Sequence, residues 1–188
     1  MDLNVYPELK EVKIYKYHGN YEEAIQILIK LIDETDEDDI AHYYLLLEYS
    51  GCLIDNIYMR ISDGVFEEEN EDLEIAWNYL EECKIKFNEI FLDNQALLKI
   101  YKYQGDIECL DNKFNDGMEA YKKAIAICED NETLVELYNS LGEACIQNNE
   151  LNESIDFYRR AYKLTNDNEK KNQIKEIITR MKIKKQKF

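Results

Sequence analysis

The chain has 188 residues, of which 23 are basic and 40 are acidic, so its formal net charge at pH 7 is −17. A surface this acidic repels nucleic acid and anionic membranes and attracts basic partners. One Pro and six Gly leave little that would interrupt helices, which favours an all-α domain. We therefore expect a helical protein whose partner is a basic protein, with no direct binding of nucleic acid or membrane.

The first predicted pair of helices covers residues 5–38. Apolar residues recur there at spacings of three and four, as on the buried face of an amphipathic helix. Gly19 marks the turn between the two helices. Counted from Val5, this pair is a degenerate copy of the later ones, and its matching residues are Tyr15, Gly19, Tyr21, Ala24 and Leu28.

The second predicted pair covers residues 40–92 and is interrupted. A long helix runs from Ile40 to about Ser62, and the apolar pattern resumes in DLEIAWNYLEECKIKF. An acidic insertion at residues 63–72 separates the two. We consider its carboxylates auxiliary contacts for a basic partner, although a charged loop that is only solvated has the same appearance. They are Glu67, Glu68, Glu69, Glu71 and Asp72.

Two regular pairs follow, at residues 98–131 and 135–168. In each, an aromatic residue is followed by Gly four residues on, and then by a small residue, a Tyr and an Ala. The matching residues are Tyr101, Gly105, Gly117, Tyr121 and Ala124 in one pair, and Tyr138, Gly142, Ser154, Tyr158 and Ala161 in the next.

A last helix is predicted at residues 168–185. Ile174, Ile177, Ile178 and Met181 recur on one side of it, as expected for a helix that caps the open end of a stack. Residues 169–188 hold eight Lys/Arg and two Glu, so the first 168 residues carry −23. The terminal RMKIKKQK is compatible with a nuclear-import signal, and equally with a Lys-rich helix end favoured by the helix dipole.

The recurring pattern resembles the tetratricopeptide repeat (TPR), a unit of two antiparallel helices in about 34 residues. The resemblance implies an all-α, right-handed helical solenoid of about four helix pairs, the second interrupted, with a C-terminal capping helix. Such a stack is a single binding domain whose concave groove is lined by the first helix of each pair.

Set in this frame, the first helices give a mostly acidic groove suited to a basic peptide or helix. Lys99 and Lys102 are local exceptions, and Leu45 and Cys52 are apolar members of the groove. The predicted binding residues are Glu48, Asp55, Asn56, Asp106, Glu136, Asn139, Glu143 and Ile146. Co-chaperones of this class that clamp a terminal carboxylate need Lys or Arg in the groove, which is the opposite sign.

Residues for catalysis or metal binding are scarce. His18 and His42 are the only histidines, and the five cysteines form no CxxC pair. The chain has no HExxH, GxSxG or Walker motif, so we predict neither an enzyme nor a bound cofactor or metal. It has no apolar run of membrane-spanning length and no signal-peptide core, so we expect a soluble intracellular protein.

The interrupted second pair, the acidity and the helix around Trp77 together resemble the histone chaperone family of nuclear autoantigenic sperm protein (NASP). YYLLLEYSGCLIDNIYMRISDGVF resembles that family's long helix before the break, and the last two repeats resemble its third and fourth. The insertion here is shorter than the acidic tract usual in the family. The resemblance implies binding of histone H3, alone or with H4, and extends to linker histone. It also implies a nuclear location with shuttling through the cytoplasm.

Other interpretations remain open at the level of the sequence. A TPR adaptor would bind a different basic or amphipathic peptide within a protein assembly. A peptide-sensing regulator would couple the repeats to an effector module, for which the chain has no residues left over. Self-association into a homodimer through exposed faces of helix 40–62 is also open.

Overall fold

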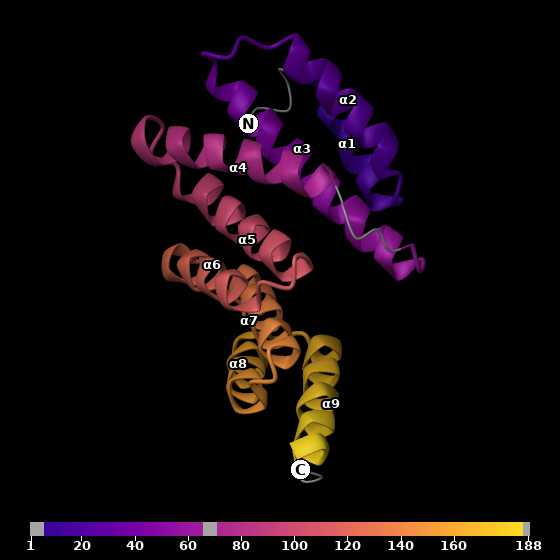
Figure 1. Cartoon of the computed structure of the whole chain (residues 1–188), viewed down its shortest axis with the longest axis vertical. Helices are drawn as coiled ribbons and strands as arrows, with labels where there is room; N and C mark the ends of the chain where they lie inside the picture. The colour runs from indigo at the N-terminus through magenta and orange to yellow at the C-terminus, as the bar shows by residue number, and fades with distance from the viewer. Residues whose placement is uncertain (1–5, 66–70, 186–188) are drawn as a thin grey trace. The chain divides into compact units, whose positions relative to one another are not determined.

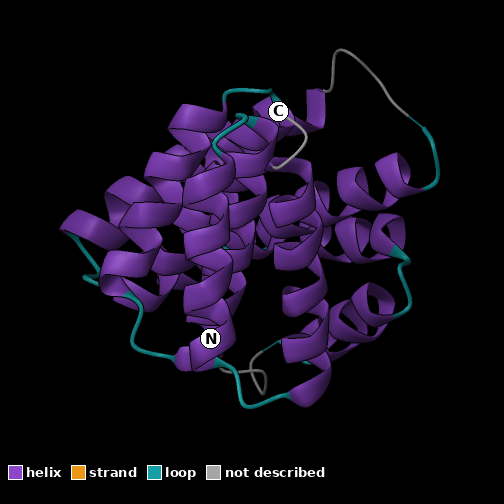
Figure 2. Ribbon diagram, turned by 90° about the horizontal axis from the view of Figure 1, so that it is seen from below, coloured by secondary structure: helices purple, strands orange, loops and turns teal. Residues whose placement is uncertain are grey.

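The computed structural model describes residues 6–65 and 71–185, which contain helices and no strand (Figure 2). The helices are α1 (Glu8–Tyr17), α2 (Tyr21–Asp33), α3 (Ile40–Ser62), α4 (Glu71–Glu89), α5 (Asn94–Leu110), α6 (Phe114–Ile127), α7 (Asn131–Gln147), α8 (Leu151–Leu164) and α9 (Asn168–Lys185) (Figure 1). The predicted pairs correspond to α1–α2, α3–α4, α5–α6 and α7–α8, and α9 is the predicted last helix. No helix in the described ranges is long and apolar enough to cross a bilayer.

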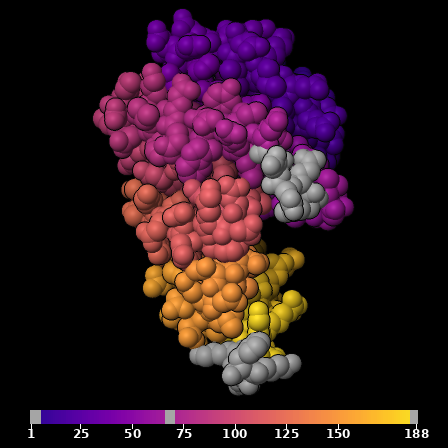
Figure 3. Space-filling view, viewed as in Figure 1, coloured from indigo at the N-terminus to yellow at the C-terminus, as the bar shows by residue number. Residues whose placement is uncertain are grey.

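The chain divides into two compact units, Met1–Tyr103 (unit 1) and Gln104–Phe188 (unit 2), with the boundary inside α5. In unit 1, α2 packs against α1 and α3, and α3 packs against α4. In unit 2, α7 packs against α6 and α8, and α8 packs against α9. Side chains fill the gaps that the ribbons leave between neighbouring helices of each unit (Figure 3).

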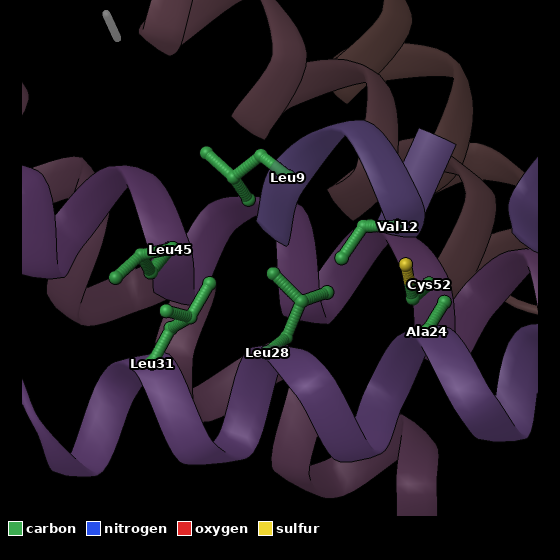
Figure 4. Close-up of a cluster of buried hydrophobic side chains, with 7 residues drawn as sticks. All are labelled: Leu9, Val12, Ala24, Leu28, Leu31, Leu45 and Cys52. Carbon is green, nitrogen blue, oxygen red and sulfur yellow. The ribbon is translucent and has the colours of Figure 1, made fainter. Parts of the chain in front are cut away.

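The first hydrophobic cluster of unit 1 joins α1, α2 and α3 (Figure 4). Its buried members are Leu9, Val12, Ala24, Leu28, Leu31, Leu45 and Cys52. Three- and four-residue spacings put the α1 and α2 members on one side of each helix, which is why these short helices can pack. Their burial removes apolar surface from water and stabilises the unit by about 25 cal/mol per Å².

An aromatic cluster joins α3 to α4 and the turn that follows. Phe87 is fully buried, with its ring centroid 4.9 Å from that of Tyr44 and 5.7 Å from that of Phe91. The Tyr44 hydroxyl donates a hydrogen bond to Asp93. The cluster therefore fixes α4 against α3 close to the point where α5 begins.

The interruption of the second pair lies between the end of α3 at Ser62 and the start of α4 at Glu71. Glu71 and Asp72 belong to the first turn of α4, where carboxylates are favoured by the helix dipole. This helix therefore begins before the predicted end of the insertion. Glu67, Glu68 and Glu69 lie outside the described residues.

Two glycines of the recurring pattern, Gly105 and Gly142, lie against a tyrosine of the same pair. A Cβ at Gly105 would meet the Tyr121 ring at 2.6 Å, and one at Gly142 would meet the Tyr158 ring at 2.7 Å. Each tyrosine hydroxyl then donates to the carboxylate that follows the glycine: Tyr121 to Asp106 at 2.7 Å, and Tyr158 to Glu143 at 3.2 Å. The sequence pattern thus specifies a tyrosine ring packed on a glycine, together with a hydrogen bond from the tyrosine hydroxyl to the carboxylate after that glycine.

Gly142→Ala is expected to lower the free energy of unfolding by about 1–3 kcal/mol, because the added methyl overpacks the buried Tyr158 ring. Without that contact, Gly→Ala inside a helix would stabilise by about 0.5–1 kcal/mol. The control is Ser140→Ala on α7, whose free energy of unfolding should stay near that of the parent protein. Urea unfolding of the two variants and the parent measures the change. A stabilised Gly142→Ala protein would contradict the contact.

The last hydrophobic cluster of unit 2 joins α7, α8 and α9. Its buried members are Val135, Ile155, Tyr158, Ala161, Ile174 and Met181, with Ile177 and Ile178 partly buried against them. The spacing predicted for the capping helix is confirmed, since all four of its apolar residues face this cluster.

Candidate functional site

The predicted acidic residues of α3 are paired with lysines from other helices of unit 1. Lys99 of α5 donates to Glu48 at 2.8 Å, and Lys16 of α1 lies 3.3 Å from Asp55. Asn56, the third predicted residue on α3, is buried at 8 % exposure. This part of the predicted groove is therefore largely neutralised within the unit.

The lysines around Glu48 change the pKa of its carboxyl group. Burial by itself would raise the pKa of the Glu48 carboxyl, but Lys99, Lys16 and Lys13 lower it below the ordinary value. Burial also works against the charge of Lys16, yet Cys52, Asp55 and Glu48 together raise the pKa of that ammonium. Both groups are therefore ionised at neutral pH.

A cavity of about 490 Å³ opens between α1, α3 and α5 of unit 1. It is lined by Leu9, Val12, Lys13, Lys16, Tyr44, Glu48 and Lys99. The lining contains three lysines and one glutamate, so the prediction of a mostly acidic first-helix face is wrong in unit 1. Leu45 and Cys52, which the repeat frame places in the groove, are fully buried because α1 and α2 cover them.

In unit 2, the predicted binding residue Asp106 is buried between α5 and α6. It is 6 % exposed and accepts the hydrogen bond from Tyr121. The carboxylate thus satisfies a tyrosine hydroxyl beside the α5–α6 contact, and a ligand would reach it only after displacing that bond.

The remaining predicted residues lie on α7. Glu136 and Glu143 are exposed, and Asn139 is half-buried with its Oδ1 lacking a hydrogen-bond partner among the described residues. Ile146 is half-buried against the cluster that α9 completes. The spacing of three and seven residues puts Glu136, Asn139 and Glu143 on one side of the helix.

A second acidic feature extends this side of α7 toward its N-terminus. Glu132 lies one turn before Glu136, is exposed, and accepts a hydrogen bond from Lys170 of α9 at 3.2 Å. The pKa of Lys170 is raised by Glu132 first, and also by Glu136 and Asp167. Glu132, Glu136 and Glu143 therefore form one exposed row, which we call the α7 acidic row.

A cavity of about 340 Å³ lies beside the α7 acidic row, where α7 begins and α8 passes into α9. It is lined by Asp130, Asn131, Glu132, Val135, Leu164, Thr165, Asn166, Asp167 and Lys170. Asp130 caps α7 by accepting from the Thr133 amide at 2.7 Å, and Asp167 accepts from the Glu169 amide at 2.8 Å. With three carboxylates and one lysine, this cavity suits a basic side chain.

Two of the predicted acidic contacts of the insertion, Glu71 and Asp72, lie among the described residues. Glu71 is exposed, and Asp72 lies 4.0 Å from Arg60 of α3. Within the described ranges, no group of three or more His, Cys, Asp or Glu residues is arranged to hold a metal ion.

Comparison with known proteins agrees with the helix pairing. A family model described as tetratricopeptide repeat matches residues 135–168. A search of curated protein sequences found no match. The structure is similar to that of the yeast histone chaperone Hif1, described as a scaffold protein recruiting protein complexes to core histones, with 14 % identity and a TM-score of 0.66 over 96 % of this chain and 95 % of that one. It is also similar to MamA, with 14 % identity and a TM-score of 0.54 over 94 % and 97 % of the two chains. The fold is of the TPR type.

The predicted groove omits the first repeat, which contributes two basic residues to it. Counted from Val5, Lys13 and Lys16 occupy the same positions in the first repeat that Cys52 and Asp55 occupy in the second. The same frame therefore places two lysines of the first repeat in the groove. The repeat frame does not identify Asp130 and Asp167 of the unit 2 cavity as groove residues, because they lie in the connections between helices.

Proposed function

We propose that this TPR protein is a histone chaperone of the NASP type, without catalytic activity, that binds histone H3 alone or as H3–H4. It shields the basic charge of the histone during storage, nuclear import and delivery to chromatin. Free histones bind nucleic acid non-selectively through their basic residues, so a chaperone must compete for those residues. A nuclear location belongs to the same proposal.

The observation that carries the proposal is the α7 acidic row. Glu132 and Glu143, the ends of the row, are eleven residue steps apart on one helix face, which is about 16 Å at 1.5 Å per residue. Lys170 pairs with Glu132, whereas Glu136 and Glu143 form no ion pair among the described residues, so a basic helix laid along this face would supply the missing cations. The half-buried Asn139 lies within the same face and offers an unused acceptor.

Two further observations support a histone as the basic partner. The net charge of −17 attracts basic proteins over distances limited by screening, about 8 Å at physiological salt. The structural likeness to Hif1 extends over almost the whole of both chains. The paired acids of unit 1 argue that the histone is held chiefly by unit 2.

The decisive experiment is binding of the full chain to H3–H4, to H3 and to linker histone, followed by size-exclusion chromatography with light scattering at about 150 mM salt. We expect a stoichiometric complex with H3 or H3–H4 that weakens at about 500 mM salt. Lysozyme, a basic protein without a histone fold, serves as the control and should elute separately. Absence of a histone complex, or equal capture of lysozyme, would contradict the proposal and favour an adaptor for another peptide.

A further inference from the structure

The cavity of unit 1 has the wrong charge for a histone. Its three lysines come from two helices, Lys13 and Lys16 from α1 and Lys99 from α5, and they surround the single carboxylate of Glu48 on α3. All three act electrostatically on Glu48. The convergence of three ammonium groups on one half-buried carboxylate is unusual in a chain that carries −17.

The positive charge of the cavity exceeds the negative charge available to balance it. Glu48 is paired with Lys99. Lys16 is paired with Asp55, a residue that does not line the cavity. Lys13 is exposed and forms no hydrogen bond or ion pair with other residues in the described part of the chain. Three ammonium groups thus face two carboxylates, which leaves a local excess of one positive charge that a further carboxylate can pair with.

The other walls of the cavity favour a carboxylate that arrives on an aliphatic stem. Leu9 and Val12 form an apolar wall, and the hydroxyl of Tyr44 is already committed to Asp93. A volume of about 490 Å³ lies in the range of sites that enclose a ligand of several residues or a small molecule. A glutamate side chain can place its methylenes on the apolar wall and its carboxylate among the lysines.

We propose that this cavity binds a glutamate-rich peptide segment of a partner protein, with one carboxylate seated between Lys13 and Lys99. The site is distinct from the α7 acidic row and takes a ligand of the opposite charge. A protein with both sites would hold a basic partner on unit 2 and an acidic partner on unit 1.

The site can be tested with a fluorescein-labelled peptide of six glutamates, titrated with the full chain and followed by fluorescence anisotropy at low salt. The strongly negative protein disfavours non-specific binding of such a probe, so saturable binding reports a local positive site. We expect Lys13→Gln with Lys99→Gln to weaken binding at least about tenfold. We expect Glu48→Gln to strengthen it about threefold, because the competing carboxylate is removed.

The matched control is Lys182→Gln with Lys184→Gln on α9, which removes the same charge from the other Lys-rich part of the chain and should leave binding unchanged. Three results would overturn the proposal: no saturable binding, loss of binding in the α9 variant instead, or weaker binding by Glu48→Gln. Inorganic phosphate that displaces the probe at equal concentration would also overturn it, since the site would then be for a small anion. Histone binding is measured separately, so failure of one proposal leaves the other intact.

Discussion

Replacing Glu136 and Glu143 by lysine together is expected to weaken binding of H3–H4 about a hundredfold, which corresponds to about 2.7 kcal/mol. The double change converts two of the three carboxylates of the α7 acidic row into repelling ammonium groups. Both side chains are exposed on one face of α7, so their loss removes contacts rather than core packing. Affinity is measured by titration with labelled H3–H4 at constant salt.

The control for this experiment is Glu37→Lys with Glu89→Lys, which changes the net charge by the same amount at exposed positions outside the first helices. It should lower the affinity only slightly, through weaker long-range attraction. Glu143 also accepts the Tyr158 hydrogen bond, so unfolding of each variant is measured in parallel. Equal loss of affinity in both double variants would assign binding to net charge and not to the α7 acidic row.

Phe87→Ala is expected to lower the free energy of unfolding by about 3–5 kcal/mol, the largest stability change among these predictions. The fully buried ring packs between Tyr44 and Phe91, and its removal leaves a cavity where α3 meets α4. Urea unfolding monitored by circular dichroism measures the change.

Ile85→Ala on the same helix is the matched control, because that side chain is 53 % exposed and its loss should cost about 0.5 kcal/mol or less. If Phe87→Ala unfolds at nearly the same urea concentration as Ile85→Ala, the aromatic cluster does not stabilise unit 1 as described.

The fold was predictable because its determinants are local and repeat. Gly142 and Tyr158 are sixteen residues apart in one helix pair, and their contact recurs as Gly105 and Tyr121 in the preceding pair. Such a pattern is visible without knowledge of any other part of the chain. The interruption after α3 was predictable for the same reason: counted from Tyr44, the pattern expects a small residue at position 63, and the matching residue is Ala76, thirteen positions later.

The site was harder to predict because charge pairing depends on neighbouring repeats. The frame placed Glu48 and Asp55 on the first-helix face, but it does not say that Lys99 and Lys16 come from the adjacent helices to meet them. Burial of Asp106 likewise depends on a tyrosine hydroxyl in the following helix. Position on a helix face can be predicted from sequence, whereas the free charge of that face requires the partners on other helices.

The tyrosine that rests on Gly142 has an effect beyond packing. Burial and the nearby Glu143 carboxylate raise the pKa of Tyr158, so its hydroxyl keeps its proton and donates to that carboxylate. Glu143 is thereby restricted to fewer rotamers before any ligand arrives. An arriving lysine or arginine would lose less side-chain entropy in fixing this acid than in fixing a freely rotating one. The contact that holds a repeat together thus also prepares one of its acids for recognition.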